Sequence, residues 1–364
     1  MTENFAFTGK AREYFRVWIV NLFLTVVTLG LYSPWAKVRR KRYLHGHTWL
    51  AGSNFDYHGD PWAILRGRLV AVVAFLLYTT TAHFSPRAGA VVLLALMPAV
   101  PWLILRSFAF NAANTSWRHL RFGFEGRYVD ALRAIAPFAL VPVATLLLPL
   151  PDAAGRPTLR NVAVLAAPGL IFGLAYPYAR ARLALLQIGG SRYAGERFHG
   201  RVGARSFYGI YVTAFLVMFA TSIVLGLAAA VFGRFAGKWL QQPDLLNIGI
   251  LAAYIVMLAI ATGYTQARIG NLVMNATRLG GLALRSRLSA RRLMRLYIGN
   301  VLAIVATLGL AVPWAVVRAL RYRAACLSIE GDGALDAFAA PRGMQAVSAT
   351  GEELGEMFAL DLSL

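Results

Sequence analysis

TLGLYSPWAKVRRKRY, residues 28–43, is the stretch from which the architecture follows, because nearly the same string returns as TLGLAVPWAVVRALRY at residues 307–322. Each copy ends an apolar run and contains a Gly-x-x-x-Pro spacing, a tryptophan and a group of cations. Glycine and proline at this spacing predict a break in a helix. The two copies therefore predict that both ends of the chain form the same local structure.

A shorter motif, an aromatic residue followed four positions later by arginine, occurs in both copies and three more times between them. Residues four positions apart share one face of a helix. Tryptophan and tyrosine favour the headgroup level of a membrane, and arginine extends its charge toward water. We expect these pairs to anchor helices or to hold anionic lipid headgroups. The five pairs are Trp35 and Arg39, Trp102 and Arg106, Tyr178 and Arg182, Tyr264 and Arg268, and Trp314 and Arg318.

The composition is that of a membrane protein: 58% of the 364 residues are hydrophobic and 15% are charged. Two apolar segments, residues 17–36 and 296–317, carry the long motif. Six other apolar runs approach or reach the length that crosses a bilayer as a helix. These six runs are residues 69–84, 88–105, 134–150, 161–179, 207–232 and 245–264.

Short strands alternate with the apolar segments. Phe5 to Gly9, Phe55 to Gly59 and Phe122 to Gly126 show apolar residues at every second position before a glycine, which predicts a strand that ends in a turn. Residues 327–331 show the same pattern, and weaker versions lie at residues 197–200 and 282–284. The sequence thus predicts one integral membrane domain, residues 1–340, and a flexible acidic tail, residues 341–364. The repeats within the domain are residues 5–54, 55–121, 122–195, 196–281 and 282–340.

The distribution of cations predicts the topology. Only five Lys and Arg residues lie in the turns at residues 85–87, 151–160 and 233–244, against 32 in the rest of the chain. By the positive-inside rule, the linkers between hairpins are cytoplasmic, and both termini are expected there too. The predicted fold is an all-α polytopic inner-membrane protein of repeated helical hairpins with short cytoplasmic strands. Six spans plus two re-entrant or short segments are favoured, and eight spans remain the alternative.

Two further sets of polar residues stand out beside the membrane segments. Asn21 and Asn300 occupy equivalent positions within the two motif-bearing segments, where an interhelical hydrogen bond is expected. All sixteen acidic residues lie outside the apolar segments, which argues against an ion-coupled transporter. Clustered cations attract anionic lipid. The basic cluster is Lys37, Arg40, Lys41 and Arg42, beside Arg39.

The sequence contains no motif for catalysis or for a cofactor. His45, His47, Asp56, His58 and Asp60 are close in sequence, but their spacing matches no zinc pattern. We therefore expect no enzyme, no metal, no cofactor and no nucleic-acid partner. Membrane lipids, especially anionic ones, are the expected partners, and a homo-oligomer is left open.

The residues 7–44, together with NFDYHGDPWAILRGR at residues 54–68 and the second long motif, resemble the YjgN-like family of bacterial inner-membrane proteins. This resemblance implies an inner-membrane location and, because the family is a domain of unknown function, no catalytic residue. Transport or permeation of a small or lipidic solute is one expected function. The alternative is a non-transporting envelope protein that binds or organises anionic lipid through a basic cytoplasmic face.

Overall fold

The computed structural model describes residues 2–147, 159–236 and 243–331, and its elements repeat the order strand, helical hairpin, strand five times. The predicted acidic tail lies outside these residues. The strands are β1 (Thr2–Phe7), β2 (Thr48–Leu50), β3 (Ser53–Tyr57), β4 (Thr115–Trp117), β5 (Leu120–Phe124), β6 (Ser191–Tyr193), β7 (Glu196–His199), β8 (Arg278–Leu279), β9 (Leu282–Ser286) and β10 (Leu327–Gly331).

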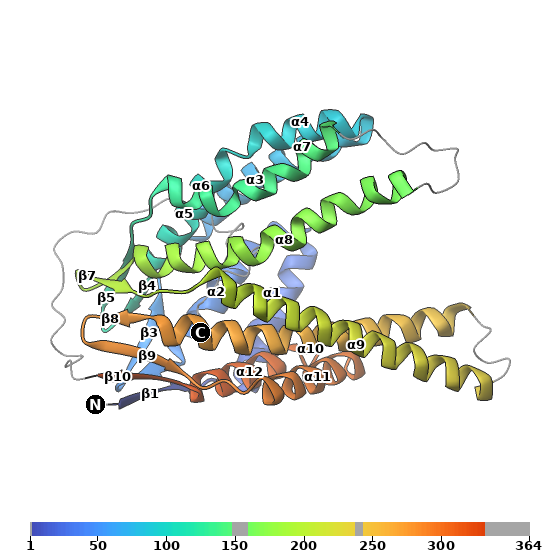
Figure 1. Ribbon diagram of the computed structural model, residues 1–364. Coiled ribbons are helices and arrows are strands. Elements are labelled where there is room, and N and C mark those ends of the chain that lie inside the picture. Colours follow the sequence, from blue (N-terminus) through green and yellow to red (C-terminus); the bar gives the residue numbers. More distant parts are fainter. Residues whose placement is uncertain (1, 148–158, 237–242, 332–364) are drawn as a thin grey trace.

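The helices form five hairpins between these strands, as Figure 1 shows. The first and last hairpins are α1 (Ala11–Val27) with α2 (Ser33–Gly46), and α11 (Ala290–Ala306) with α12 (Val312–Ala325). The second is α3 (Pro61–Phe84) with α4 (Pro86–Leu96) and α5 (Ala99–Ala113). The third and fourth are α6 (Tyr128–Ile135), η1 (Ala136–Ala139) and α7 (Leu140–Leu147) with α8 (Leu159–Gly190), and α9 (Ala204–Ala236) with α10 (Pro243–Ala276).

The ten strands close into a small antiparallel barrel in the order β1-β10-β9-β8-β7-β6-β5-β4-β3-β2. Most odd-numbered strands are staggered across two neighbours: β3 pairs Ser53 and Asn54 with β2, and Phe55 to Tyr57 with β4. Two-residue turns join β2 to β3, β4 to β5 and β6 to β7. Both residues of each turn have positive φ, as type I′ turns require. These turns are Ala51-Gly52, Arg118-His119 and Ala194-Gly195.

Aromatic side chains fill the barrel. The rings of Phe5 and Phe122 stack on opposite sides of Phe55, with centroids 6.2 and 6.5 Å away. Tyr193 packs on Phe122 at 4.8 Å, and its hydroxyl donates to the carbonyl of Trp117 at 3.0 Å. Burial raises the pKa of Tyr193 to about 12, so the phenol stays a neutral donor. Packed aromatic side chains therefore fill the inside of the barrel, which is not a pore. We call these side chains the plug.

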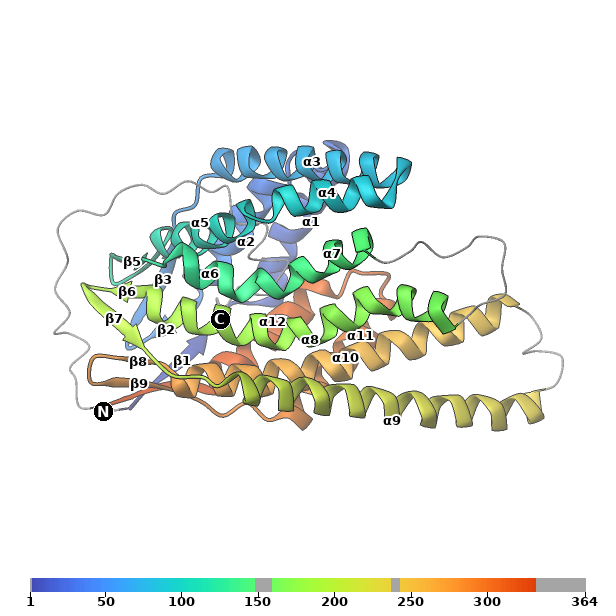
Figure 2. The same ribbon diagram turned by 45° about the horizontal axis from the view of Figure 1, so that its top comes forward.

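All five hairpins leave the barrel toward the same side and return to it (Figures 1 and 2). Within the described residues, five helical segments are long and apolar enough to cross a membrane, and the bent pair α4–α5, with 49° between its parts, is a sixth candidate. Pro98 and Pro101 lie at this bend, where proline removes helix hydrogen bonds. The six candidates coincide with the six apolar runs of the sequence.

The first and last hairpins are short. α1 and α11 have 17 residues each, whereas α9 and α10 have 33 and 34. The two short hairpins lie side by side, because β1 pairs with β10 and Arg321 of α12 donates to the carbonyl of Gly9 at 3.1 Å. The five hairpins therefore form a closed ring, in which the first and last hairpins extend less far from the barrel than the others.

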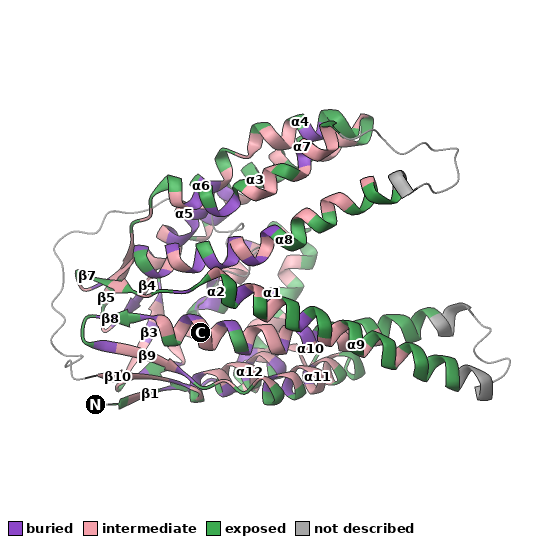
Figure 3. Cartoon of the chain, in the orientation of Figure 1, coloured by how far each residue is buried: buried purple, intermediate pink, exposed green. Residues whose placement is uncertain are grey.

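Burial follows the distance from the barrel. Buried residues gather around the strands, and the far parts of α9 and α10 are exposed (Figure 3). Only 6% of the most apolar window of α9 is buried within the protein. Such long apolar faces are stable when lipid covers them. The expected fold of helical hairpins with short strands is thus confirmed in outline, and the strands join in a closed ten-stranded barrel.

Candidate functional site: a cationic cavity inside the ring of hairpins

The repeated long motif builds the tips of the two short hairpins. Leu29 and Gly30 have φ of 50° and 90°, and the equivalent Leu308 and Gly309 have φ of 49° and 94°. In each copy the motif threonine, Thr28 or Thr307, bonds back to the preceding turn of helix, and its hydroxyl oxygen accepts the N–H four residues on, at 3.0 and 2.9 Å. TLGL is therefore a tight turn between two helices.

The rest of the motif fastens the two helices of each short hairpin together. Asn21 of α1 donates to the carbonyl of Ala36 at 3.4 Å and accepts from Arg39 at 3.4 Å. Asn300 of α11 repeats both bonds at 3.2 and 3.3 Å, with Ala315 and Arg318 as its partners.

The last residue of the motif ties the second helix to the start of the first. The hydroxyl of Tyr43 accepts the N–H of Lys10 at 3.0 Å, and the hydroxyl of Tyr322 accepts the N–H of Ser289 at 2.9 Å. The threonine, the arginine and the tyrosine of the motif therefore make the same hydrogen bonds in both hairpins.

The five aromatic–arginine pairs lie at one level of the fold. Trp35, Trp102, Tyr178 and Trp314 each precede the first residue of the following strand by 13 positions, and Tyr264 precedes it by 14. At 1.5 Å per helical residue this distance is about 20 Å. In four pairs the guanidinium lies over the ring of the same pair, at 5.0–5.7 Å from the centroid: Arg106, Arg182, Arg268 and Arg318. Trp35 instead packs edge-on against Trp62 at 4.9 Å.

A cavity of about 920 Å³ lies inside the ring of hairpins, next to the barrel. In the first four hairpins only the second helix lines it (α2, α5, α8 and α10), and in the last hairpin both α11 and α12 do. None of the ten residues of the aromatic–arginine pairs is among its described lining residues. The pairs and the cavity are thus separate features.

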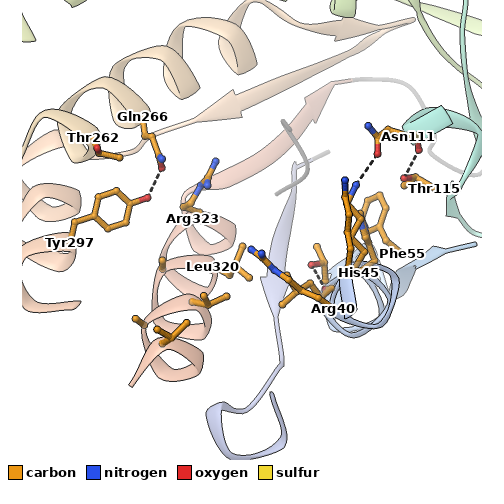
Figure 4. Close-up of a pocket in the computed structure, with 18 of the residues that line it drawn as sticks. Arg40, His45, Phe55, Asn111, Thr115, Thr262, Gln266, Tyr297, Leu320 and Arg323 are labelled. Atoms are coloured by element: carbon orange, nitrogen blue, oxygen red, sulfur yellow. Dashed lines mark hydrogen bonds between the residues drawn. The ribbon is translucent and has the colours of Figure 1, made fainter. Parts of the chain in front are cut away.

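The part of the cavity nearest the barrel is cationic. Lys37, Arg40 and Lys41 of α2 line it, and Arg323 of α12 lies across from them (Figure 4). Lys41 is only 7% exposed and donates to Asn111 of α5 at 2.8 Å. No aspartate or glutamate occurs among the described residues that line the cavity.

Neutral polar groups continue this surface. The hydroxyl of Tyr297 donates to Gln266, and this bond joins α11 to α10 (Figure 4). The hydroxyl of Thr115 donates to the backbone carbonyl of Asn111 at 2.9 Å. Ser107 is fully buried, and among the described residues its hydroxyl has no hydrogen-bond partner.

The part of the cavity farther from the barrel is apolar, and α10, α11 and α12 form its wall. Its lining includes Ile255 and Leu258 of α10, Ile304 of α11, and Val312 of α12. At the other end, Phe55 and Phe122 of the plug form the floor. The cavity thus has a charged base on a closed floor and an apolar wall above it.

Some of the residues predicted from the sequence line the cavity, and others do not. Three members of the basic cluster, Lys37, Arg40 and Lys41, line the cavity together with Asn300, whereas Arg42 and Asn21 are not among the lining residues. Apart from Asn300, sequence reasoning missed the polar cavity residues outside α2, because nothing in the local sequence marks them. The lining residues that it missed include Ser107, Asn111, Gln187, Thr262, Gln266, Tyr297 and Arg323.

The histidines near the first strand pair point to separate partners. His47 Nδ1 donates to the carbonyl of Tyr43 at 2.7 Å, His58 contacts Ser116 at 2.8 Å, and the His45 ring stacks on Tyr57. Among the described residues no group of three or more metal-ligating side chains converges.

A closed barrel that carries repeated apolar hairpins around an internal cavity defines a multi-pass integral membrane protein with internal repeats. The chain belongs to the family described as "Bacterial protein of unknown function (DUF898)", whose model matches residues 2–357. It is 26% identical to the inner membrane protein YjgN of Salmonella typhimurium over 90% of this chain and 88% of that protein. The YjgN proteins of Escherichia coli O157:H7 and K12 are 31% and 30% identical over 34% of this chain and 31% of theirs.

No solved structure matches the chain. The comparisons confirm the YjgN-like resemblance, and the protein is a multi-pass inner-membrane protein.

Proposed function

We propose that the protein binds an anionic amphiphile of the membrane in the central cavity, with the headgroup at the cations and the hydrocarbon chain along the apolar wall. The observation that carries this proposal is the pairing of Lys37, Arg40, Lys41 and Arg323 at the base with an apolar wall above, without a carboxylate among the described lining residues. A soluble anion would make no use of the wall, and a neutral lipid would make no use of the base.

The chemistry of the base suits a phosphate headgroup. Arginine presents paired donors that match phosphate oxygens, and lysine acts as a point charge. The Lys41 ammonium is oriented by its hydrogen bond to Asn111. Several cations held close together repel one another in a site of low dielectric, so a bound anion stabilises the arrangement.

The same geometry supports binding over permeation. A path from the cavity through the barrel would have to pass Phe55, Phe122 and the other rings of the plug. The proposal therefore assigns no open pore and no catalytic step, and the lipid-binding alternative takes precedence over solute permeation.

We further propose that the barrel lies on the cytoplasmic side, and that the two short hairpins enter the membrane from that side and return. The barrel and its turns are rich in arginine, whereas the far turns of the long hairpins have few cations, in agreement with the positive-inside rule. The 17 residues of α1 are about 26 Å long, which is less than the roughly 30 Å of the hydrocarbon core. Part of this length lies beside the barrel, where α1 begins.

The test is lipid binding by the purified full-length protein, measured by native mass spectrometry with phosphatidylglycerol and phosphatidylcholine as probes. The parent should prefer phosphatidylglycerol. The double variant Arg40→Gln/Arg323→Gln should bind it about 30-fold more weakly, since each cation near a lipid surface contributes roughly 1 kcal/mol.

Arg42→Gln is the matched control, because Arg42 lies on the same helix two residues from Arg40 and is not among the cavity-lining residues. It should leave the preference unchanged. Equal binding of both lipids by the parent, or equal losses in the control and the double variant, would contradict the proposal.

A further inference from the structure

The leucines at the tips of the two short hairpins have no structural explanation. Leu29 and Leu308 are each 95% exposed, so their side chains pack on almost nothing in the protein. Both have positive φ, a conformation that glycine or asparagine adopts more readily than leucine. Backbone strain that recurs at equivalent positions, without a packing gain, points to a role outside folding.

The place of these leucines is the low part of the ring. α1/α2 and α11/α12 are neighbours, and they end well short of α8, α9 and α10 in both views (Figures 1 and 2). The neighbouring tips therefore form a low edge between taller helices. We call the turns at residues 28–31 and 307–310 the lip.

The cavity reaches this edge at the turn of the last hairpin. Ile304 and Val312 line the cavity, and they stand on either side of the turn that carries Leu308. The apolar wall is thus continuous with the lip, while the charged base lies next to the barrel.

We propose that the hydrocarbon chain of the bound amphiphile passes over the lip, between the cavity and the bilayer, in contact with Leu29 and Leu308. This inference rests on the proposed function and adds a route and an orientation for the ligand: headgroup toward the barrel, chain toward the lip. It explains why a bulky apolar residue occupies a turn position that favours glycine, since glycine would offer the chain no surface.

The test replaces both leucines by glycine in the full-length protein. Leu29→Gly/Leu308→Gly removes the strained φ without removing any packed side chain, so the melting temperature should be equal or higher. Binding is measured with two probes, phosphatidylglycerol and glycerophosphoglycerol, which has the same headgroup chemistry and no chains. The double variant should bind phosphatidylglycerol about tenfold more weakly, from the loss of two apolar contacts, and glycerophosphoglycerol as the parent does.

Ala51→Gly is the matched control, because Ala51 has φ of 46° in a turn of the barrel, away from the lip. It should change neither dissociation constant. Unchanged binding of phosphatidylglycerol by the double variant would refute the contact between the hydrocarbon chain and the lip. An equal loss of affinity for both probes would also refute it, because it would mean that the turns act on the charged base. A parent that binds neither probe would instead overturn the proposed function itself, and the lip with it.

Discussion

At the scale of single residues, Asn21 has a structural role in the first hairpin. Asn21 is 7% exposed, and its amide satisfies one backbone carbonyl and one arginine at once. The asparagine stabilises the hairpin because it joins α1 to α2 by two hydrogen bonds, and without it a guanidinium nitrogen of Arg39 would lose its partner. Asn21 is also not among the cavity-lining residues, so its loss separates folding from binding.

Asn21→Ala should therefore lower the stability by about 1–2 kcal/mol and leave the lipid preference unchanged. The measurement is thermal unfolding in detergent, followed by tryptophan fluorescence, beside the lipid-binding assay. Thr213→Ala serves as control, because the Thr213 hydroxyl bonds only within its own exposed helix turn, to Gly209 at 2.8 Å. An Asn21→Ala protein that melts with the parent would show that the asparagine is dispensable.

At the scale of elements, the glycine that follows several odd-numbered strands has a packing role. A Cβ on Gly9 would lie 2.6 Å from the ring of Phe7, and one on Gly59 would lie 2.5 Å from the ring of Tyr57. In both cases the aromatic residue two positions earlier folds over the glycine, which lets the chain turn from the barrel into a helix. The pattern that predicted a strand and a turn thus also encodes the contact between them.

Gly59→Ala should destabilise the protein by about 1–3 kcal/mol, because the ring of Tyr57 would have to move out of a packed cluster. Gly46→Ala is the comparison: nothing lies within 4 Å of a Cβ there, and the residue ends helix α2. The same fluorescence melts should show a loss for the first variant and none for the second. Equal melting temperatures would refute the packing role.

The elements also show what the sequence could predict. Long apolar runs, the repeat and the odd-numbered strands were recognisable because each is a local pattern. β2, β4 and β6 have three residues each and β8 has two, too few for a periodic signal, so the closed barrel was not predictable. For the same reason three cavity cations were found as a run in α2, but Arg323 and Asn111 were not, because only closure of the ring brings them there.

At the scale of the whole molecule, one orientation in the membrane should account for every hairpin. Arg287 lies beside the barrel with its side chain 84% exposed, and Arg87 is exposed at the far end of the second hairpin. With Cys326→Ala as background, Arg287→Cys should react with an impermeant maleimide only after spheroplasts are permeabilised, whereas Arg87→Cys should react in intact ones. The opposite labelling pattern would place the barrel outside and contradict the proposed sidedness.

The pairing of β1 with β10 sets a condition on biosynthesis. Thr2 to Asn4 form their strand contacts with residues 328–330, so the first strand leaves the ribosome some 300 residues before its partner exists. Until then β1 has an open edge, and a chain that stops early never closes it. Exposed strand edges invite aggregation and proteolysis. A truncated chain would therefore keep an open strand edge that the closed barrel covers.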